Sequence, residues 1–539
     1  MADALAASGW QAAQYETRFL AARTALDLGM REEAERLLKQ VSRRRSRGPA
    51  DIRILGWQAH ALHALSEGRI AAAERALTAG LRVHAEHSAI LGATELRVYA
   101  AGQGHDLAAL GVRLAIEHRD ARALLRWAEA QRATSLRRRP VRPPDDAQTG
   151  DDLAALRRIS AQMVEATTRE KGLSGRRAGR AKLNAERLRL EAAVRDRTRY
   201  ARGEYAPDPP FSAAALVAAL GERVLVEFVR VDDVLYAVTV AGGAVRRHRL
   251  GSYSQVLKHL DSLRFSMSRL AWKFSSPTLW SAATATFDHS RQTLDALLFV
   301  ELRAVVGTDA SGDLVIVPTG SLHALPWGTL PTCASRAVTI APSARLWMAA
   351  AEAAAEAETV GRQPDRTALI AGPGLDHAGP EIDALAPLYP HATVLTGPTA
   401  TASAVAKALD GADLAHIATH GRFRADHPLF SSFDTYDGPL FAYDLERLAA
   451  APRVLVLSAC ESALSGVRAG DELMGLASSM FTLGARTIIS SIVPVDDDET
   501  RTVMLEFHRA LADLPPAAAL AKAMSRTGIE GWVCLGYGG

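Results

Sequence analysis

The spacing of apolar residues divides this 539-residue chain into two kinds of segment. Residues 151–200 carry apolar side chains mostly three, four or seven positions apart, the spacing of helices that bury one face. Gly172–Gly175 interrupts this pattern, so we predict an antiparallel helical hairpin. Its two apolar stripes are Leu153, Leu156, Ile159 and Met163, then Leu183, Leu190 and Val194.

Downstream of residue 207, short apolar runs of strand length replace these stripes. Runs beginning at Val224 and Leu235 flank Asp232-Asp233 and predict a β-hairpin. Six further runs are apolar on both faces, as in the middle of a parallel sheet, and helical segments lie between them. This alternation predicts a three-layer α/β sandwich with functional residues at the carboxyl ends of strands. The six runs begin at Leu314, Ala337, Thr367, Leu414, Val454 and Thr487, and the helices cover 344–357, 381–388, 402–409, 472–483 and 500–511.

The first 135 residues are rich in Ala, Leu, Arg and Glu and almost free of proline, which favours helices. Gly29, Gly68 and Gly104 each precede an alanine by five positions, and these glycines are 39 and 36 residues apart. Small residues at a helix turn and at a helix contact are typical of stacked helical hairpins. The segment resembles degenerate tetratricopeptide repeats, and an ordinary helical bundle is the alternative. The expected parts of the chain are residues 1–135, 136–206 and 207–539.

Composition narrows the class of protein. The chain is 48% apolar and 23% charged, as globular proteins are, and its formal net charge of +3 indicates no class of partner. Cys333, Cys460 and Cys534 are the only cysteines, too few and too far apart for a disulfide framework or a zinc site. The N-terminus lacks the pattern of a signal peptide, and no apolar stretch is long enough to span a bilayer. We expect a cytoplasmic protein that needs no metal or cofactor.

Two of the strand-like runs end at reactive side chains. LAHIATHG ends at His420-Gly421, and VLVLSACES carries Cys460 beyond its apolar part. A free thiol, with a pKa of about 8.5, becomes a nucleophile when a base lies beside it. An imidazole can take that proton and later protonate a leaving amine. The pair therefore predicts a cysteine protease, with a buried cysteine and a structural histidine as the alternatives. We expect His416, deeper on the same face, to be structural, and His427 to be a loop residue.

A series of motifs in one order resembles the CHAT domain, the caspase-like peptidase domain associated with tetratricopeptide repeats. These motifs are VIVPTGSLHALPWGTL, VTIAPSARLW, LAHIATHGRF, LVLSACESALSG, AGDELMGLASSMFTLGARTIISSIVPVDDDET and the closing GWVCLGYGG. The resemblance covers residues 225–539 and implies a caspase-like fold. It also implies that His420 is the general base, that Cys460 is the nucleophile, and that the backbone N–H groups of Gly421 and Cys460 bind the oxyanion.

Four consecutive carboxylates, from Asp496 to Glu499, follow the last predicted strand. Such a cluster attracts a cation. Relatives that cut after arginine or lysine carry an acid in the corresponding loop, and the resemblance assigns this place to Asp497. We therefore expect Asp497 to bind a basic side chain just before the cut. The alternative is that these acids stabilise the start of a helix from Thr500. Val493 stands where the family usually has an aromatic residue.

The combined expectation is a cysteine endopeptidase that cuts a protein substrate and is regulated by a protein activator at its helical repeats. The resemblance implies bacterial regulated proteolysis, in defence signalling. One alternative is a catalytically silent scaffold of the same architecture. Another is a nucleic-acid-gated protein, because arginine runs can contact phosphates, although few aromatic residues lie among them for base stacking. These runs are Arg43–Arg45 with Arg47, Arg137–Arg139 with Arg142, and Arg176-Arg177 with Arg180.

Overall fold

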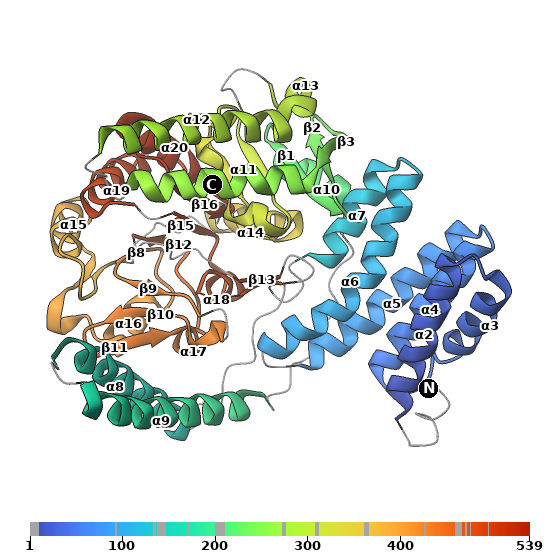
Figure 1. Cartoon of the computed structure of the whole chain (residues 1–539). Helices are drawn as coiled ribbons and strands as arrows, with labels where there is room; N and C mark the ends of the chain where they lie inside the picture. The colour runs from blue at the N-terminus through green and yellow to red at the C-terminus, as the bar shows by residue number, and fades with distance from the viewer. Residues whose placement is uncertain are drawn as a thin grey trace. The chain divides into compact units, whose positions relative to one another are not determined.

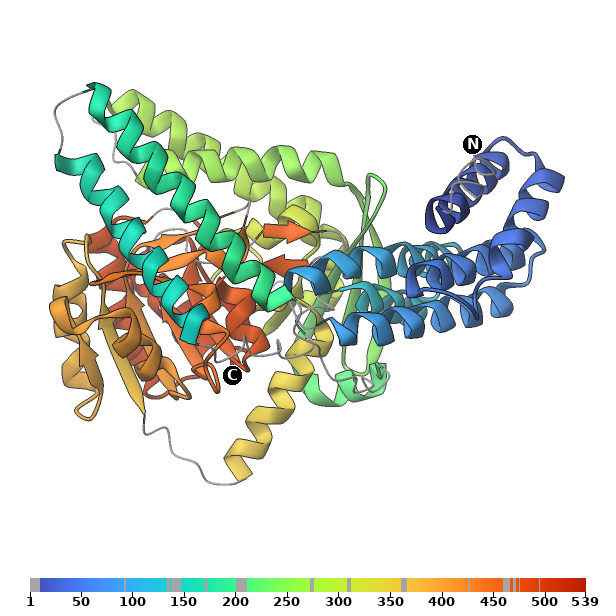
Figure 2. The ribbon, with the colours of Figure 1, turned by 90° about the horizontal axis from the view of Figure 1, so that it is seen from below.

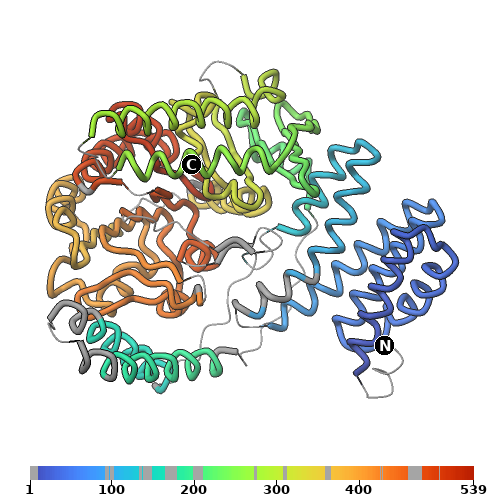
Figure 3. Tube along the Cα trace, viewed as in Figure 1, coloured from blue at the N-terminus to red at the C-terminus, as the bar shows by residue number. Residues whose placement is uncertain are grey.

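We describe a computed structural model of the chain, whose trace is coloured in Figure 3 where residues are described. The described residues are 10–539 without the following segments: 92–93, 133–135, 137–146, 170–172, 200–210, 272–275, 308–311, 360–365, 425–426, 459–465, 469–471, 475 and 494. They form two compact units. The first unit comprises residues up to 135 and 201–211, and the second unit comprises residues 136–200 and 212–539.

The described part of the first unit is mainly helical, as the composition predicted. Its helices are α2 (Gln11–Asp27), α3 (Arg31–Ser42), α4 (Ala50–Ser66), α5 (Ile70–Ile90), α6 (Thr94–Glu117) and α7 (Ala121–Gln131), each packed on the next. Gly29 and Gly68 lie at helix turns with φ of +72° and +71°, a backbone conformation that favours glycine. Gly104, in contrast, lies inside α6, where an added Cβ would come within 2.7 Å of the His84 ring. The predicted third turn at Gly104 is therefore wrong, because that glycine allows a close helix contact instead.

An eleven-stranded sheet organises the second unit (Figure 1). In spatial order its strands are β3 (Ala244–Ser252), β2 (Val234–Ala241), β1 (Val224–Val231), β4 (Leu314–Val317), β5 (Val338–Ile340), β16 (Trp532–Gly536), β15 (Thr487–Ser491), β12 (Val454–Leu457), β8 (Leu414–Ala418), β6 (Thr367–Ala371) and β7 (Thr393–Leu395). The sheet is mixed, because β16 runs parallel to β5 but antiparallel to β15. Strands β15, β12, β8, β6 and β7 form one parallel block, so their carboxyl ends lie at one edge.

Helices cover both faces of this parallel block, as Figure 1 shows. Ile370 and Ile417 pack with α16 and α18 on one face, whereas Leu369 and Ala418 pack with α15 on the other. Consecutive residues of a strand point to opposite faces, so runs that are apolar throughout become central strands. The α-helices of this unit that follow residue 212 are α10 (Ala213–Leu220), α11 (Tyr253–Ala271), α12 (Pro277–Phe299), α13 (Arg303–Val306), α14 (Ala344–Thr359), α15 (Ala378–Leu385), α16 (Ala402–Leu409), α17 (Ala442–Leu445), α18 (Leu476–Thr482), α19 (Asp497–Leu511) and α20 (Pro516–Thr527).

The predicted helical hairpin belongs to the second unit. Its helices α8 (Ala147–Arg169) and α9 (Leu173–Arg199) lie side by side in Figures 1 and 2. Leu153, Leu156 and Val194 are buried in the same apolar cluster as Phe430 and Phe441 of the α/β domain. Arg157 adds an ion pair with Asp444 at 2.9 Å. The hairpin is therefore part of the core that surrounds the sheet.

Two small sheets complete the unit. One consists of β9 (Gly421–Arg422), β10 (Ser432–Thr435) and β11 (Gly438–Phe441), and it follows β8 directly in sequence. The other pairs β13 (Gly466–Arg468) with β14 (Glu472–Met474). The helix predicted over 472–483 is therefore wrong in its first turn: Glu472–Met474 is a strand, and α18 begins at Leu476. Pairing with β13 overrides the helical pattern at this point.

Candidate active site at the carboxyl edge of β8 and β12

Strands β8 and β12 are direct neighbours, and they run parallel. Val454 pairs with Leu414 and Leu457 with Ile417, so paired residues differ by forty positions in the sequence. The Ser458 N–H continues this ladder by donating to the Ile417 carbonyl at 2.9 Å. His420 lies two residues beyond the end of β8. Cys460 lies two residues after Ser458 in the sequence and outside the described residues.

Backbone contacts fix the position of His420. Its carbonyl accepts a hydrogen bond from the Asp434 N–H at 2.9 Å. Its ring Nε2 lies 3.0 Å from the Gly374 carbonyl, which can only accept, so Nε2 carries the proton in this arrangement. Nδ1 is then the ring nitrogen with a lone pair, and the side chain is half-buried. The imidazole is thus oriented with one nitrogen able to accept a proton.

The loop that orients His420 follows β6 and has the sequence Gly372-Pro373-Gly374. An added Cβ at Gly372 would lie 1.9 Å from the Thr419 hydroxyl oxygen, closer than atoms can approach. Gly374 has a φ of +82°, and its carbonyl is the partner of the His420 ring. Glycine is therefore required twice, once for close approach and once for backbone conformation. This loop is not among the elements predicted from the sequence, although two glycines and a proline after a strand are a turn signal.

Gly421 and Asp497, the other predicted site residues, both lie at the start of an element, β9 and α19. Gly421 begins β9, pairs with Phe433 and does not have a positive φ. Asp497 is the first residue of α19. Asp496 caps that helix, since its carboxylate accepts from the N–H groups of Asp498 and Glu499 at 3.1 and 3.4 Å. The acidic segment thus begins α19, which is the place that the alternative interpretation required, and the side chain of Asp497 lies outside the described residues.

A chain of buried polar side chains connects the two strands beneath this edge. The Ser458 hydroxyl donates to Glu381 Oε1 at 2.7 Å, and His416 Nε2 lies 2.9 Å from the same oxygen. The second contact has ion-pair distance but not the angle of a good hydrogen bond. His416 Nδ1 lies 2.9 Å from His508 Nε2, and His508 Nδ1 lies 2.7 Å from the Tyr389 hydroxyl. His416 is therefore a structural histidine, as expected from its depth.

One arrangement of protons satisfies this chain. Burial raises the pKa of Tyr389 to about 12, so its hydroxyl stays protonated and can donate to His508. Burial, together with the adjacent His416, holds the pKa of His508 well below its usual range, so this ring is neutral. His508 can then donate to His416, and His416 can point its remaining N–H toward Glu381. The chain thus joins β12, α15, β8 and α19 without requiring a charged histidine.

The structure describes only some of the arginines that were considered as nucleic-acid contacts. Arg44 donates to the Tyr15 hydroxyl at 2.6 Å, and Arg45 lies over the Trp57 ring at 5.6 Å from its centroid, so both make contacts within the chain. Arg180 is exposed on α9. The runs Arg137–Arg139 with Arg142 lie outside the described residues, as do the side chains of Arg176 and Arg177. No helix among the described residues has the length and apolarity needed to cross a membrane.

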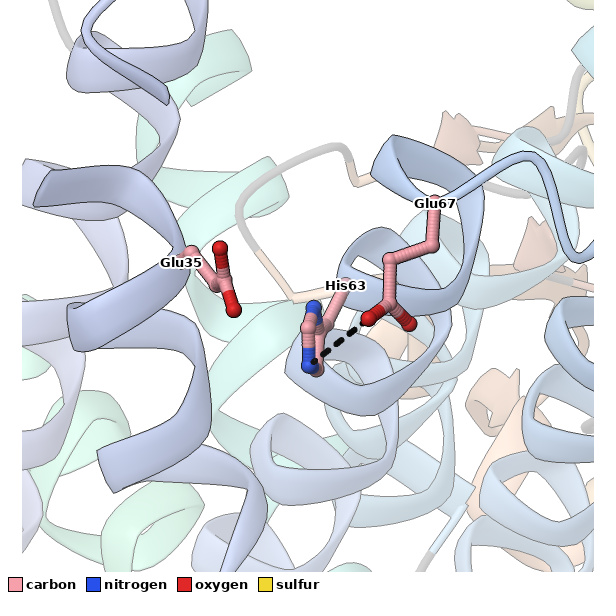
Figure 4. A group of neighbouring side chains, drawn as sticks. All are labelled: Glu35, His63 and Glu67. Carbon is pink, nitrogen blue, oxygen red and sulfur yellow. Dashed lines mark ion pairs between the residues drawn. The ribbon is translucent and has the colours of Figure 1, made fainter. Parts of the chain in front are cut away.

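Within the described residues, one group has metal-ligand geometry (Figure 4). Ligand atoms of Glu35, His63 and Glu67 lie within 4.8 Å of one another. Both carboxylates already pair with a cation, Glu35 with Lys39 and Glu67 with Arg69. We therefore assign no metal to this group.

Comparison with known proteins identifies part of the chain. Residues 288–527 match the CHAT domain family model. Two crystal structures of the Saccharomyces cerevisiae separase–securin complex, at 3.0 and 2.6 Å resolution, share 10% sequence identity with the chain and have TM-scores of 0.44 and 0.43. Each match covers 97% of this chain but 47% of the separase-complex chain, so the chain spans about half of that length. None of the curated proteins matches the chain. The predicted fold class, a helical region before a large α/β sandwich, is confirmed, and residues 288–527 of the chain are similar to the CHAT domain family.

Proposed function

We propose that this protein is a cysteine endopeptidase in which His420 and Cys460 act together. The observation that carries this proposal is the pairing of β8 with β12. The two strands pair with an offset of forty positions, and His420 and Cys460 are also forty positions apart. Neighbouring strands lie about 4.8 Å apart, so residues at matching positions beyond their ends start from adjacent points on one edge. This geometry supports a thiol and an imidazole within reach of one another.

In the proposed reaction, Nδ1 of His420 takes the proton of the Cys460 thiol. The sulfur then attacks the carbonyl carbon of the scissile peptide bond, and the backbone N–H groups of Gly421 and Cys460 donate to the oxyanion. When the tetrahedral intermediate collapses, the C–N bond breaks and His420 protonates the leaving amine. Water, deprotonated by His420, then hydrolyses the thioester. The bond between Nε2 and the Gly374 carbonyl holds the ring in one orientation during these steps.

The preference for a basic residue before the cut is a finer part of the proposal. Asp497 lies at the start of α19, just after the carboxyl end of β15, which is the strand beside β12. A carboxylate near that edge can pair with an arginine or lysine side chain of the substrate. The first unit, with its packed antiparallel helices, is proposed to bind a protein that regulates the enzyme.

The test is cleavage of a peptide library by the full chain. The products are sequenced by mass spectrometry for the native protein, Cys460→Ala and His420→Ala. We expect cleavage by the native protein and a loss of at least about a hundredfold in both variants, because each removes one half of the dyad. His427→Ala is the matched control and keeps full activity, since His427 lies in a separate loop. Equal cleavage by Cys460→Ala, or none by the native protein with or without added cell extract, would leave the non-catalytic scaffold as the better account.

A further inference from the structure

A cavity of about 520 Å³ lies between the α8–α9 hairpin and the small sheet β9–β10–β11. Both walls belong to the same unit, and the hairpin wall is held by the buried apolar cluster and the Arg157–Asp444 pair. The cavity is therefore a fixed feature of the α/β domain. Its volume is in the range of sites that bind small ligands or a few residues of a peptide.

The cavity adjoins the segments that position His420. Pro373, in its lining, directly precedes Gly374, whose carbonyl contacts the His420 ring. Arg422, also in the lining, lies two residues after His420. In a cysteine protease the histidine protonates the leaving amine, so the part of the substrate that follows the scissile bond lies on the histidine side. The cavity is lined by residues of the two segments that contact or follow His420, so a substrate segment bound there would lie near the histidine.

A buried carboxylate is among the residues that line this cavity. Glu191, on α9, is 4% exposed and lines it. Its Oε1 accepts from Arg187 and from Arg424, both at 2.5 Å. Its Oε2 is buried and has no hydrogen-bond partner among the residues that the structure describes. A buried carboxylate oxygen without a donor is unfavourable, so a donor from a bound molecule would stabilise it.

The other residues that line the cavity indicate which chemical groups a bound molecule would carry. Leu156, Met163, Phe430 and Phe441 give apolar walls, suited to a bulky apolar side chain. Four arginines and two acids also line the cavity, so its charge is positive on balance; they are Arg180, Arg187, Arg422 and Arg424, with Glu191 and Asp434. Because this balance repels a cation, a neutral N–H is the better donor for Glu191 Oε2, and an acidic group is favoured near the exposed Arg180.

We propose that this cavity binds the substrate segment that follows the scissile bond, with a bulky apolar side chain against Leu156 and Phe430, a backbone N–H donated to Glu191, and an acidic side chain near Arg180. The inference rests on the proposed endopeptidase function. It assigns the hairpin a part in substrate selection, because α8 and α9 supply one wall of the site.

The first experiment measures binding, so that it does not depend on turnover. Full-length Cys460→Ala protein is titrated against two pools of fluorescein-labelled hexapeptides and followed by fluorescence anisotropy. One pool contains one Leu or Phe and one Glu per peptide, and the other carries Lys in place of Glu. We expect the acidic pool to bind several-fold more tightly. Ala161→Trp, which fills the cavity from α8, is expected to weaken binding by about tenfold or more.

The matched control is Gln162→Trp, which adds the same ring at the adjacent, exposed position of α8. It is expected to bind like the parent. Ala161→Leu fills less of the cavity and is expected to weaken binding in the same direction by less, which covers the case in which the tryptophan variant does not fold. Thermal midpoints of all variants establish that they are folded. Equal binding by the parent and both Ala161 variants, or no binding of either pool, would overturn the proposal.

The second experiment separates this inference from the proposed function. Cleavage-site profiles of the native chain, Ala161→Trp and Gln162→Trp are compared on the same peptide library. We expect Ala161→Trp to lose the preference for apolar and acidic residues after the cut and to keep the preference before it. Peptide binding without any cleavage would support the cavity and refute the endopeptidase. Cleavage with an unchanged profile in Ala161→Trp would support the endopeptidase and refute the cavity assignment.

Discussion

At the scale of single residues, the site depends on polar contacts between positions that are far apart in the sequence. Gly374 orients His420 across 46 positions, and Ser458 contacts Glu381 across 77. His508 contacts His416 across 92. These side chains are buried or half-buried, so each unmade contact would leave a polar atom without a partner. The chain of contacts beneath the edge therefore holds β8 and β12 in place below their reactive ends.

His508 makes stability dependent on pH. Burial and His416 lower its pKa in the folded state, whereas the unfolded chain has an ordinary histidine with a pKa of about 6.5. Below that pH the unfolded state binds the additional proton, so the free energy of unfolding falls as the pH falls. The contribution of this one group is at most about 1.4 kcal/mol per pH unit. We predict that His508→Gln has a shallower decline than the native protein.

The measurement is urea unfolding of both proteins between about pH 5 and 8. His391→Gln is the matched control, because His391 is exposed and its replacement leaves the native slope unchanged. The quantity compared is the slope with pH, which differs from any loss of stability that His508→Gln causes at all pH values. Parallel slopes in the native protein and His508→Gln would contradict the assignment of a neutral His508.

Sequence patterns could predict these residues only in part. The His-Gly and Ala-Cys motifs are local, so they indicated His420, Gly421 and Cys460 directly. Glu381, His508 and Tyr389 lie in helical or loop segments with no local signal, and only the fold brings them together. The Gly372–Gly374 loop carried a turn signal, but its partner Thr419 could not be found from spacing. The cavity was likewise not predictable, because its walls come from segments more than 200 positions apart.

At the scale of elements, apolar patterns predicted where strands and helices begin, but not every direction or pairing. The six apolar runs became strands, yet β4 and β5 run against β15 and β12 because β16 joins the two blocks. Glu472–Met474 became a strand through its pairing with β13. The hairpin was predicted from its stripes, and the same leucines now form its contact with the α/β domain. Stripes indicate which face is buried, whereas the partner of that face depends on the fold.

The hairpin is predicted to depend on its ion pair with the α/β domain. Arg157 donates to both carboxylate oxygens of Asp444, at 3.0 and 2.9 Å. Burial raises the pKa of Asp444 despite the opposing effect of Arg157, so the carboxylate needs this partner. We predict that Arg157→Ala lowers the free energy of unfolding by roughly 2–3 kcal/mol, because it removes the arginine that donates to both oxygens of this buried acid.

The matched variant is Arg158→Ala, at the adjacent and exposed position of α8. It is expected to change the free energy of unfolding by less than about 0.5 kcal/mol. Both are measured by urea unfolding at neutral pH. A hairpin that merely lies near the domain would give the same small change in the two variants, and this result would also weaken the hairpin's proposed part in substrate selection.

At the scale of the whole molecule, a helical unit and an α/β unit share one chain, and the CHAT family match lies within the second. The second unit supplies the proposed dyad, its buried support and the cavity. The first unit supplies stacked helices of the kind that bind other proteins. Under the proposed function, both members of the dyad belong to the second unit, and the first unit is the proposed binding site of a regulator.

The central claim, that His420 activates the Cys460 thiol, is tested most directly by the alkylation rate of each cysteine. The full chain is treated with iodoacetamide at neutral pH, and modified peptides are quantified by mass spectrometry over time. Cys333 and Cys534 serve as internal controls, because each is 1% exposed and burial raises the pKa of both thiols. We predict that Cys460 reacts at least about tenfold faster in the native protein and in His427→Ala than in His420→Ala. Equal rates of Cys460 alkylation in the native protein and His420→Ala would contradict the dyad.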